Sequence, residues 1–137
     1  MTMRRQFLAM IITAAALAVA WPVMVQATVR ECKTRIDLVQ GDLDDILNGN
    51  GIGGANPQQT YTSLTSKLQG ATLKLDQKKN ADALQKLVDF KTAVIAMRDA
   101  AKPKLSPIDA GLLLDGNDSV AIDEGIYGAI ECVALLP

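Results

Sequence analysis

Apolar residues recur at alternating steps of three and four along two long segments, on either side of a polar connector at residues 76–80. The first segment carries Tyr61, Leu64, Leu68, Ala71 and Leu75, and the second carries Ala83, Leu87, Phe90, Val94 and Met97. This spacing places each set on one stripe of an α-helix. Because Leu84, Val88 and Ile95 widen the second stripe, that helix needs more than one packing neighbour.

Three further segments complete the predicted fold. One helix follows Val29, Cys32, Ile36, Val39, Leu43 and Ile46, and the last one follows Ile122, Ile126, Ala129, Ile130 and Val133. A shorter helix begins at Ser106-Pro107, because serine is a good N-cap and proline suits the first helical position. Asn80 is the expected N-cap of the second long helix. These patterns predict an all-α antiparallel bundle of four to five helices with short loops, except for a glycine-rich loop near residues 48–59 anchored by Ile52.

Residues 1–27 read as a cleaved export signal, which leaves residues 28–137 as a single helical domain. Arg4 and Arg5 precede an apolar run, and Val25 and Ala27 are small residues at the positions a signal peptidase reads. An uncleaved membrane anchor is the alternative. The paired arginines before Phe7-Leu8 resemble a twin-arginine signal, and the general secretory route stays open beside it. We expect a periplasmic or secreted protein with no stable membrane insertion after cleavage.

Cys32 and Cys132 are the only two cysteines, one in the first predicted helix of the domain and one in the last. In an oxidising compartment two cysteines favour one disulfide, which would tie the two ends of the domain together. Two free buried thiols are the alternative.

The composition argues against several functions. The chain has no histidine, and removing Arg4 and Arg5 from its 14 basic and 15 acidic residues leaves a formal net charge of −3. No nucleic-acid partner is therefore expected. Without histidine and with paired cysteines, the chain lacks the commonest general base, metal ligand and thiolate nucleophile. We expect no enzyme, no catalytic residues and no cofactor.

Three segments superficially resemble ligand sites. Asp42, Asp44 and Asp45 could hold a cation, but carboxylates this close along a helix are expected to point apart into water. The loop 48–57 superficially resembles a phosphate loop without the Gly-Lys-Ser/Thr that should come after it. Residues 115–126 match part of a calcium loop through Asp115, Asn117, Ser119 and Asp123, yet Val120 and Ile126 replace its essential glycine and bidentate glutamate. We read that segment as a turn and N-cap, with calcium left open.

Residues 36–113 resemble the FIMAH-type helical domain. The resemblance is carried by Ser63-Leu64-Thr65-Ser66-Lys67-Leu68, Ala71, Leu75, Ala83, Leu87, Phe90, Val94, Lys104-Leu105-Ser106, Ala110 and Leu113, and by the Gly-Ile turn near Gly51-Ile52. It implies a small helical module of the kind appended to secreted or surface-bound bacterial enzymes, without catalytic residues of its own. This chain carries no such enzyme and adds a C-terminal helix.

Export, a single core and the absence of a catalytic pattern together favour a non-catalytic interaction protein. We expect an accessory subunit or adaptor whose partner is another exported protein, possibly an enzyme. The alternative is a carrier of a small apolar ligand, bound in a cavity between the helices. Six apolar residues could line such a cavity: Ile95, Met97, Leu112, Leu114, Leu135 and Leu136.

Overall fold

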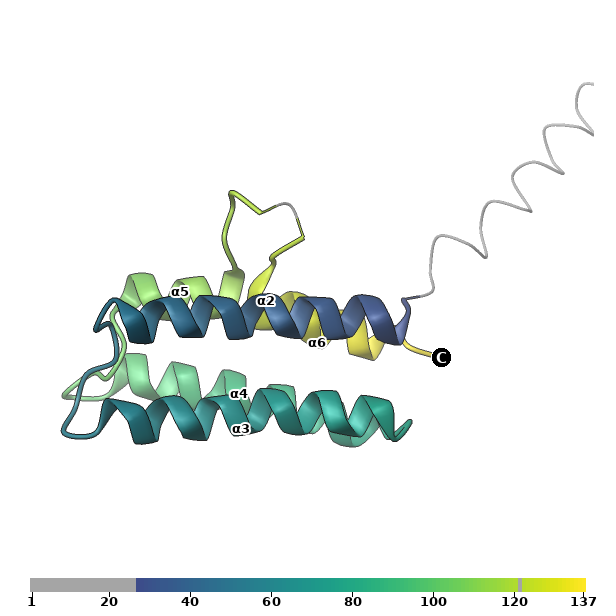
Figure 1. Cartoon of the computed structure of the whole chain (residues 1–137), viewed down its shortest axis with the longest axis horizontal. Coiled ribbons are helices and arrows are strands. Elements are labelled where there is room, and N and C mark those ends of the chain that lie inside the picture. The colour runs from purple at the N-terminus through teal and green to yellow at the C-terminus, as the bar shows by residue number, and fades with distance from the viewer. Residues whose placement is uncertain (1–26, 121) are drawn as a thin grey trace, which may run out of the picture.

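The computed structural model describes residues 27–120 and 122–137. The described residues form five α-helices, labelled as in Figure 1: α2 (Val29–Asn48), α3 (Pro57–Asp76), α4 (Asn80–Asp99), α5 (Pro107–Asp115) and α6 (Gly125–Ala134). Residues 1–26, and with them nearly all of the predicted export signal, lie outside the described residues. None of the described helices is both long enough and apolar enough to cross a bilayer.

The helices pack as a square antiparallel bundle. α2 packs against α3, α3 against α4, and α4 against both α5 and α6, which in turn pack against α2. The short helices α5 and α6 follow one another along the bundle and together occupy the position of a fourth long helix (Figure 1). The segment between them projects away from the bundle. The predicted all-α antiparallel bundle is confirmed, with its fourth helix divided in two.

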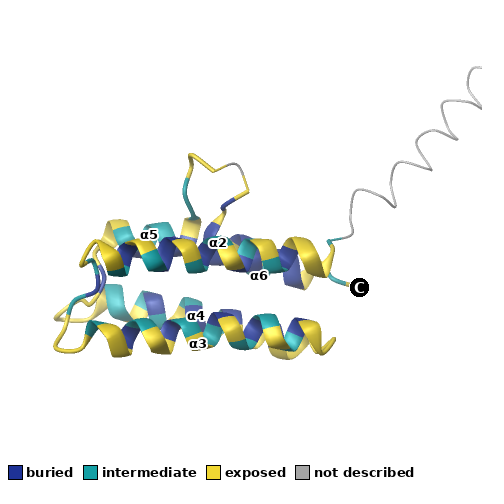
Figure 2. Cartoon of the chain, in the orientation of Figure 1, coloured by how far each residue is buried: buried dark blue, intermediate teal, exposed yellow. Residues whose placement is uncertain are grey.

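The core is built from the apolar stripes seen in the sequence, which turn inward from every helix (Figure 2). Phe90 of α4 and Leu64 of α3 are fully buried, as are Val39 and Leu43 of α2 and Leu113 of α5. Truncating a buried residue of this size to alanine typically costs about 2–5 kcal/mol. The side chains at steps of three and four therefore supply most of the stability of the fold.

The helix ends test the predicted caps. Ser106 caps α5, because its Oγ accepts a hydrogen bond from the Asp109 N–H at 3.1 Å. Thr28 and Glu31 form a capping box at the start of α2. The N-cap predicted at Asn80 is wrong: α4 begins at Asn80, and Lys79 occupies the cap without a side-chain bond. The Asn80 amide instead reaches towards the carbonyl oxygen of Pro137, 3.5 Å away.

The predicted disulfide is present. Cys32, in the first turn of α2, is bonded to Cys132 near the end of α6, with 5.4 Å between the Cα atoms and a sequence separation of 100. The bond joins the helix that opens the described fold to the helix that closes it. In the chain-entropy model a crosslink of this span is worth about 4–5 kcal/mol.

The glycine-rich loop between α2 and α3 is anchored as predicted, because Ile52 is only 3% exposed. Its backbone amides are used within the fold. The Gly51 N–H donates to the carbonyl oxygen of Ile46, and the Gly53 N–H donates to that of Lys104, both at 2.8 Å. A phosphate loop needs free N–H groups at these places, so the loop is a structural connection.

Candidate functional site

A loop of residues 116–124 interrupts the fourth helix, and we call it the excursion loop. Its two ends, Gly116 and Gly125, adopt positive φ angles of 89° and 63°. They lie so close together that a Cβ on Gly116 would be 2.6 Å from the Gly125 nitrogen and would collide with the Asp123 carbonyl. Glycine is the residue that tolerates this geometry. The chain therefore leaves the fourth helix and returns to it at nearly the same point.

Asp123 closes the neck of the excursion loop. Its Oδ2 accepts a hydrogen bond from the Asn117 N–H, and its Oδ1 accepts one from the Gly125 N–H, each at 3.1 Å. The side chain is 7% exposed. The last helix was predicted to include Ile122, which is wrong: α6 begins only at Gly125, and Ile122 is half exposed. The Asp123 carboxylate stabilises the non-helical neck by satisfying two backbone donors that helical turns would otherwise satisfy.

The oxygen atoms predicted as calcium ligands serve the loop itself. Asn117 Oδ1 accepts hydrogen bonds from the Ser119 N–H and hydroxyl, at 3.0 and 2.6 Å. Asp123 is engaged with the neck, and Asp115 is exposed at the end of α5. Among the described residues, no group of three or more acidic or cysteine side chains is placed to hold a metal ion. The segment is therefore a hydrogen-bonded turn, as the sequence favoured, although the side chain of the α6 N-cap residue Glu124 makes no capping bond.

Asp42 of α2 lies beneath this neck. It was expected to point into water with Asp44 and Asp45, but it is only 8% exposed, and its Oδ2 atom has no hydrogen-bond donor among the described residues. Burial, the contact with Asp123 and its charge, and the charge of Asp45 together raise the pKa of Asp42 to about 7. Two carboxyl groups in contact share one proton, because both cannot ionise cheaply when buried together.

The three acidic residues of α2 thus point in different directions. Asp44 faces α3, where it accepts a hydrogen bond from the Tyr61 hydroxyl at 2.6 Å and another from Gln40 Nε2 at 2.9 Å. The bond to Asp44 raises the pKa of Tyr61, so its phenol stays protonated at neutral pH. Asp45 is exposed. They do not converge on a common cation.

A groove of about 690 Å³ runs beside the excursion loop, between the first half of α2 and α6. One wall comes from α2 and the residue before it: Ala27, Arg30, Glu31, Thr34 and Arg35. The other wall comes from α6 and its flanks: Glu124, Gly128, Glu131, Cys132 and Leu135, with Ile122 of the loop at one end. Ile122 and Leu135 are each about half exposed, at 50% and 52%. The groove therefore has an accessible aliphatic side chain from each of these two residues, and most of its other lining side chains are polar or charged.

Arg35 connects the groove to the excursion loop. Its Nη1 donates to the carbonyl oxygen of Ile122 at 3.4 Å and lies 3.6 Å from Glu124 Oε1. A Cβ on Gly128 would meet Glu124 Cβ at 2.5 Å and Arg35 Nη1 at 3.2 Å, so the missing side chain leaves room for this link. Arg35 thus holds Ile122 at the end of the groove.

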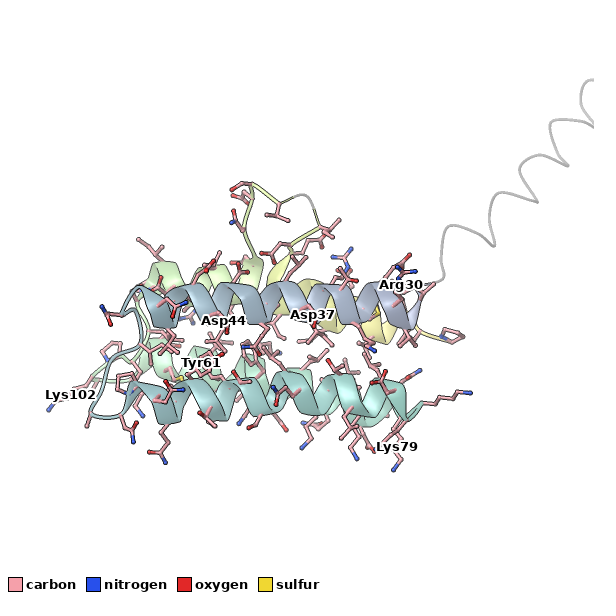
Figure 3. The ribbon with its side chains drawn as sticks, viewed as in Figure 1. Arg30, Asp37, Asp44, Tyr61, Lys79 and Lys102 are labelled. Carbon is pink, nitrogen blue, oxygen red and sulfur yellow. A yellow bond between two sulfur atoms is a disulfide. The ribbon has the colours of Figure 1, made fainter. Side chains whose placement is uncertain are left out.

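Charge is divided between the two layers of the bundle. The layer of α3, α4 and their loops, residues 57–105, has nine basic and four acidic residues. The rest of the domain, residues 28–56 and 106–137, has three basic and eleven acidic residues. Figure 3 shows Lys79 and Lys102 at opposite ends of the basic layer, and Asp37 and Asp44 along α2 in the acidic one. The groove and the excursion loop belong to the acidic layer.

The residues predicted to line an apolar cavity mostly fill the core. Leu114 is buried, and Ile95, Met97, Leu112 and Leu136 are partly buried against the core. Leu135 lines the groove. The apolar-ligand carrier stays a prediction.

Asp42 was expected in water, and neither Arg35 nor the two neck glycines was predicted as a site residue. Asp42 carried a usable signal, since it lies on the stripe of Val39, Leu43 and Ile46 that faces the core. A carboxylate on such a stripe indicates a buried polar contact. Arg35 carried no comparable signal, because its partners are 87 and 89 residues away in sequence.

Comparisons with known proteins found no match: no family model, no curated protein and no solved structure is similar to this chain at the significance required. The resemblances to the FIMAH-type domain and to a twin-arginine signal stay predictions.

Proposed function

We propose that the protein is a non-catalytic, exported adaptor or accessory subunit that binds another exported protein through the excursion loop and the adjoining groove. The observation that carries this proposal is the divided fourth helix. Its ends, Gly116 and Gly125, are in contact, so the residues between them leave the path of the fourth helix and return to it at the same point. The loop nevertheless projects from the bundle and exposes Val120 and Ile122, at 39% and 50%. Binding residues in proteins are found disproportionately on loops that a rigid scaffold positions.

The charge of the surrounding surface defines the kind of partner. Residues 106–137, which include the loop and α6, carry six acidic residues and no basic one. Arg35 on the opposite wall is paired with Glu124, whereas Glu131 makes no ion pair among the described residues. The partner surface that fits is an apolar pocket for Ile122 with a basic rim. Such complementarity increases the association rate and makes it sensitive to salt.

Export supports a partner in the same compartment. The signal-like segment precedes the described domain, and the disulfide between Cys32 and Cys132 is of the kind that persists in oxidising compartments. We propose that the protein acts in the periplasm or outside the cell, and that its partner is an exported protein such as an enzyme.

The experiment places a photo-crosslinking amino acid at Ile122 in one variant and at Ile108 in another. Both positions are exposed and aliphatic, but Ile108 is 84% exposed in the first turn of α5, outside the groove. Crosslinking in the native envelope and mass spectrometry should identify one stoichiometric exported protein from position 122 and not from position 108. Equal labelling from both positions, or no adduct from either, would contradict the proposal.

Two substitutions test the chemistry of the contact. Ile122→Ser should weaken binding of the captured partner at least about tenfold, since burying one aliphatic side chain is worth about 1.5–3 kcal/mol. Ile108→Ser is its matched control and should bind normally. Glu131→Lys should slow association at low salt, whereas Lys79→Glu, in the basic layer, should not. Binding unaffected by Ile122→Ser would place the contact elsewhere on the molecule.

The ligand-carrier alternative has a separate test. Organic extraction of the purified protein should release no bound lipid, and fatty acids should not raise its melting temperature.

A further inference from the structure

We propose that the excursion loop is controlled by one proton: it is held against α2 while Asp42 and Asp123 share that proton, and it is released when the proton is lost. The consequence for partner binding rests on the proposed function. If the loop binds the partner, only the protonated state presents its side chains in the arrangement of this structure.

The geometry of the pair requires a proton. Asp42 comes from the middle of α2 and Asp123 from the neck of the loop, and the two side chains are 8% and 7% exposed. The neighbouring Asp123 carboxyl group raises the pKa of Asp42 by its contact and by its charge. Two carboxylates have no donor between them, so a hydrogen bond between these groups requires one of them to be protonated. The otherwise unpartnered Oδ2 of Asp42 is the natural place for that proton.

The hydrogen bonds assign the proton to Asp42. Asp123 accepts from two backbone N–H groups, those of Asn117 and Gly125, and such bonds favour a charged carboxylate. Asp42 receives none from the backbone of the loop. The neutral Asp42 therefore donates to the charged Asp123, and this bond ties the neck to α2.

The charged surroundings determine the effect of deprotonation. The groups that act on Asp42 are carboxyl groups only, Asp123 from the loop and Asp45 from its own helix. Of the other charged groups of the elements packed around it, Asp115 at the end of α5 is exposed, and Glu124 before α6 is paired with Arg35. The remaining charged groups of these elements are Asp118 in the loop, Asp109 in α5, Glu131 in α6, Arg30, Glu31, Lys33, Asp37 and Asp44 in α2, and Lys67, Lys74 and Asp76 in α3. With no basic side chain acting on the pair, a second negative charge repels Asp123 and loosens the neck.

Loosening the neck alters the groove. Ile122 precedes Asp123 directly, and its carbonyl oxygen is the acceptor for Arg35 on α2. If Asp123 moves away from α2, Ile122 leaves the end of the groove and the Arg35 contact is lost. Acidic conditions thus favour the binding-competent loop and alkaline conditions oppose it.

The experiment measures amide hydrogen exchange by NMR on the purified protein with its disulfide intact, at pH 5.5 and pH 8.0. Exchange is expressed as protection relative to the intrinsic rate at each pH. The amides that report on the neck are those of Asn117 and Gly125. Because Asp42 titrates near 7 in the closed state and near 3.8 when released, their protection should fall by up to about 30-fold between these two pH values.

The matched variant is Asp42→Asn, whose side-chain amide donates to Asp123 at every pH. It should keep the Asn117 and Gly125 amides protected at pH 8.0. Unchanged protection in the unsubstituted protein, or an equal loss in Asp42→Asn, would overturn the inference. So would neck protection at pH 8.0 that depends on added Ca²⁺ instead of on the Asp42 proton.

The two proposals fail in different ways. If Ile122→Ser abolishes partner binding but neck protection does not depend on pH, the control by the proton is wrong and the proposed function stands. If neck protection follows the protonation of Asp42 but Ile122→Ser binds its partner normally, the proposed function is wrong and the proton-controlled loop stands.

Discussion

Asp42→Asn should stabilise the whole protein at alkaline pH, although it replaces a buried residue. The pKa of Asp42 rises from 3.8 in the unfolded chain to about 7 in the fold. The folded state therefore binds the proton more tightly, and stability falls as pH rises between these values. At about 1.4 kcal/mol per pKa unit, the full loss is about 4 kcal/mol, and about 2 kcal/mol of it occurs between pH 5.5 and pH 8.0.

The assay is urea unfolding of the unsubstituted protein and of Asp42→Asn at both pH values, followed by circular dichroism. Asparagine provides a permanent donor to Asp123 and has no titration, so the variant should lose this pH dependence. The difference in free energy of unfolding should shift in favour of Asp42→Asn by about 2 kcal/mol between pH 5.5 and pH 8.0. The difference between the two proteins is what isolates Asp42, since their other titrating groups are the same.

Asp123→Asn is the control that separates proton sharing from simple removal of charge. It also eliminates the repulsion, but its amide would direct a donor at a backbone N–H of Asn117 or Gly125. It should therefore destabilise the protein by about 1–3 kcal/mol at both pH values. Parallel pH profiles for the unsubstituted protein and Asp42→Asn, or stabilisation by Asp123→Asn, would refute the assignment of the proton.

Three further outcomes are expected. Replacing Cys32 and Cys132 together with serine should lower the free energy of unfolding by about 4 kcal/mol, measured in urea; a loss below about 1 kcal/mol would show that the crosslink adds little. Gly116→Ala should destabilise the neck, because a Cβ there collides with the Asp123 carbonyl. Its melting temperature in thermal unfolding should be lower than that of Gly111→Ala, the control, where nothing lies within 4 Å of the added Cβ. Tyr61→Phe should cost about 1 kcal/mol through its lost hydrogen bond to a carboxylate of α2, and an unchanged urea midpoint would contradict this.

The bundle could be predicted because its information is local. The spacing of Leu64, Leu68 and Leu75 fixes the buried face of α3 whatever it packs against, and the Ser106-Pro107 pair fixes the start of α5 by interactions within one turn. The disulfide could be predicted from the expected export to an oxidising compartment and from the presence of two cysteines, without any knowledge of geometry. One helix boundary that failed was at Asn80, where several neighbouring polar residues are almost equally able to cap.

The division of the fourth helix could not be read in the same way. Ile122 continues the apolar spacing of α6, so its pattern alone predicted a helical position. Whether it is helical depends on the Asp123 carboxylate, which takes the N–H groups of Asn117 and Gly125 and lies against Asp42 of another helix. The same backbone N–H groups could instead form helical hydrogen bonds. The contact of Asp123 with Asp42, which is far away in sequence, favours the non-helical arrangement.

The sequence by itself determined the helices, their buried faces, the crosslink between Cys32 and Cys132 and the excess of acidic residues. These depend on spacing, residue type and composition, which act over a few residues or over the whole chain. The tertiary structure alone decided that charge separates into an acidic and a basic layer, that Arg35 reaches Ile122, and that Asp42 meets Asp123. Each of these requires side chains from distant segments to share one place, and their hydrogen bonding and ionisation are defined only once the bundle has brought them together.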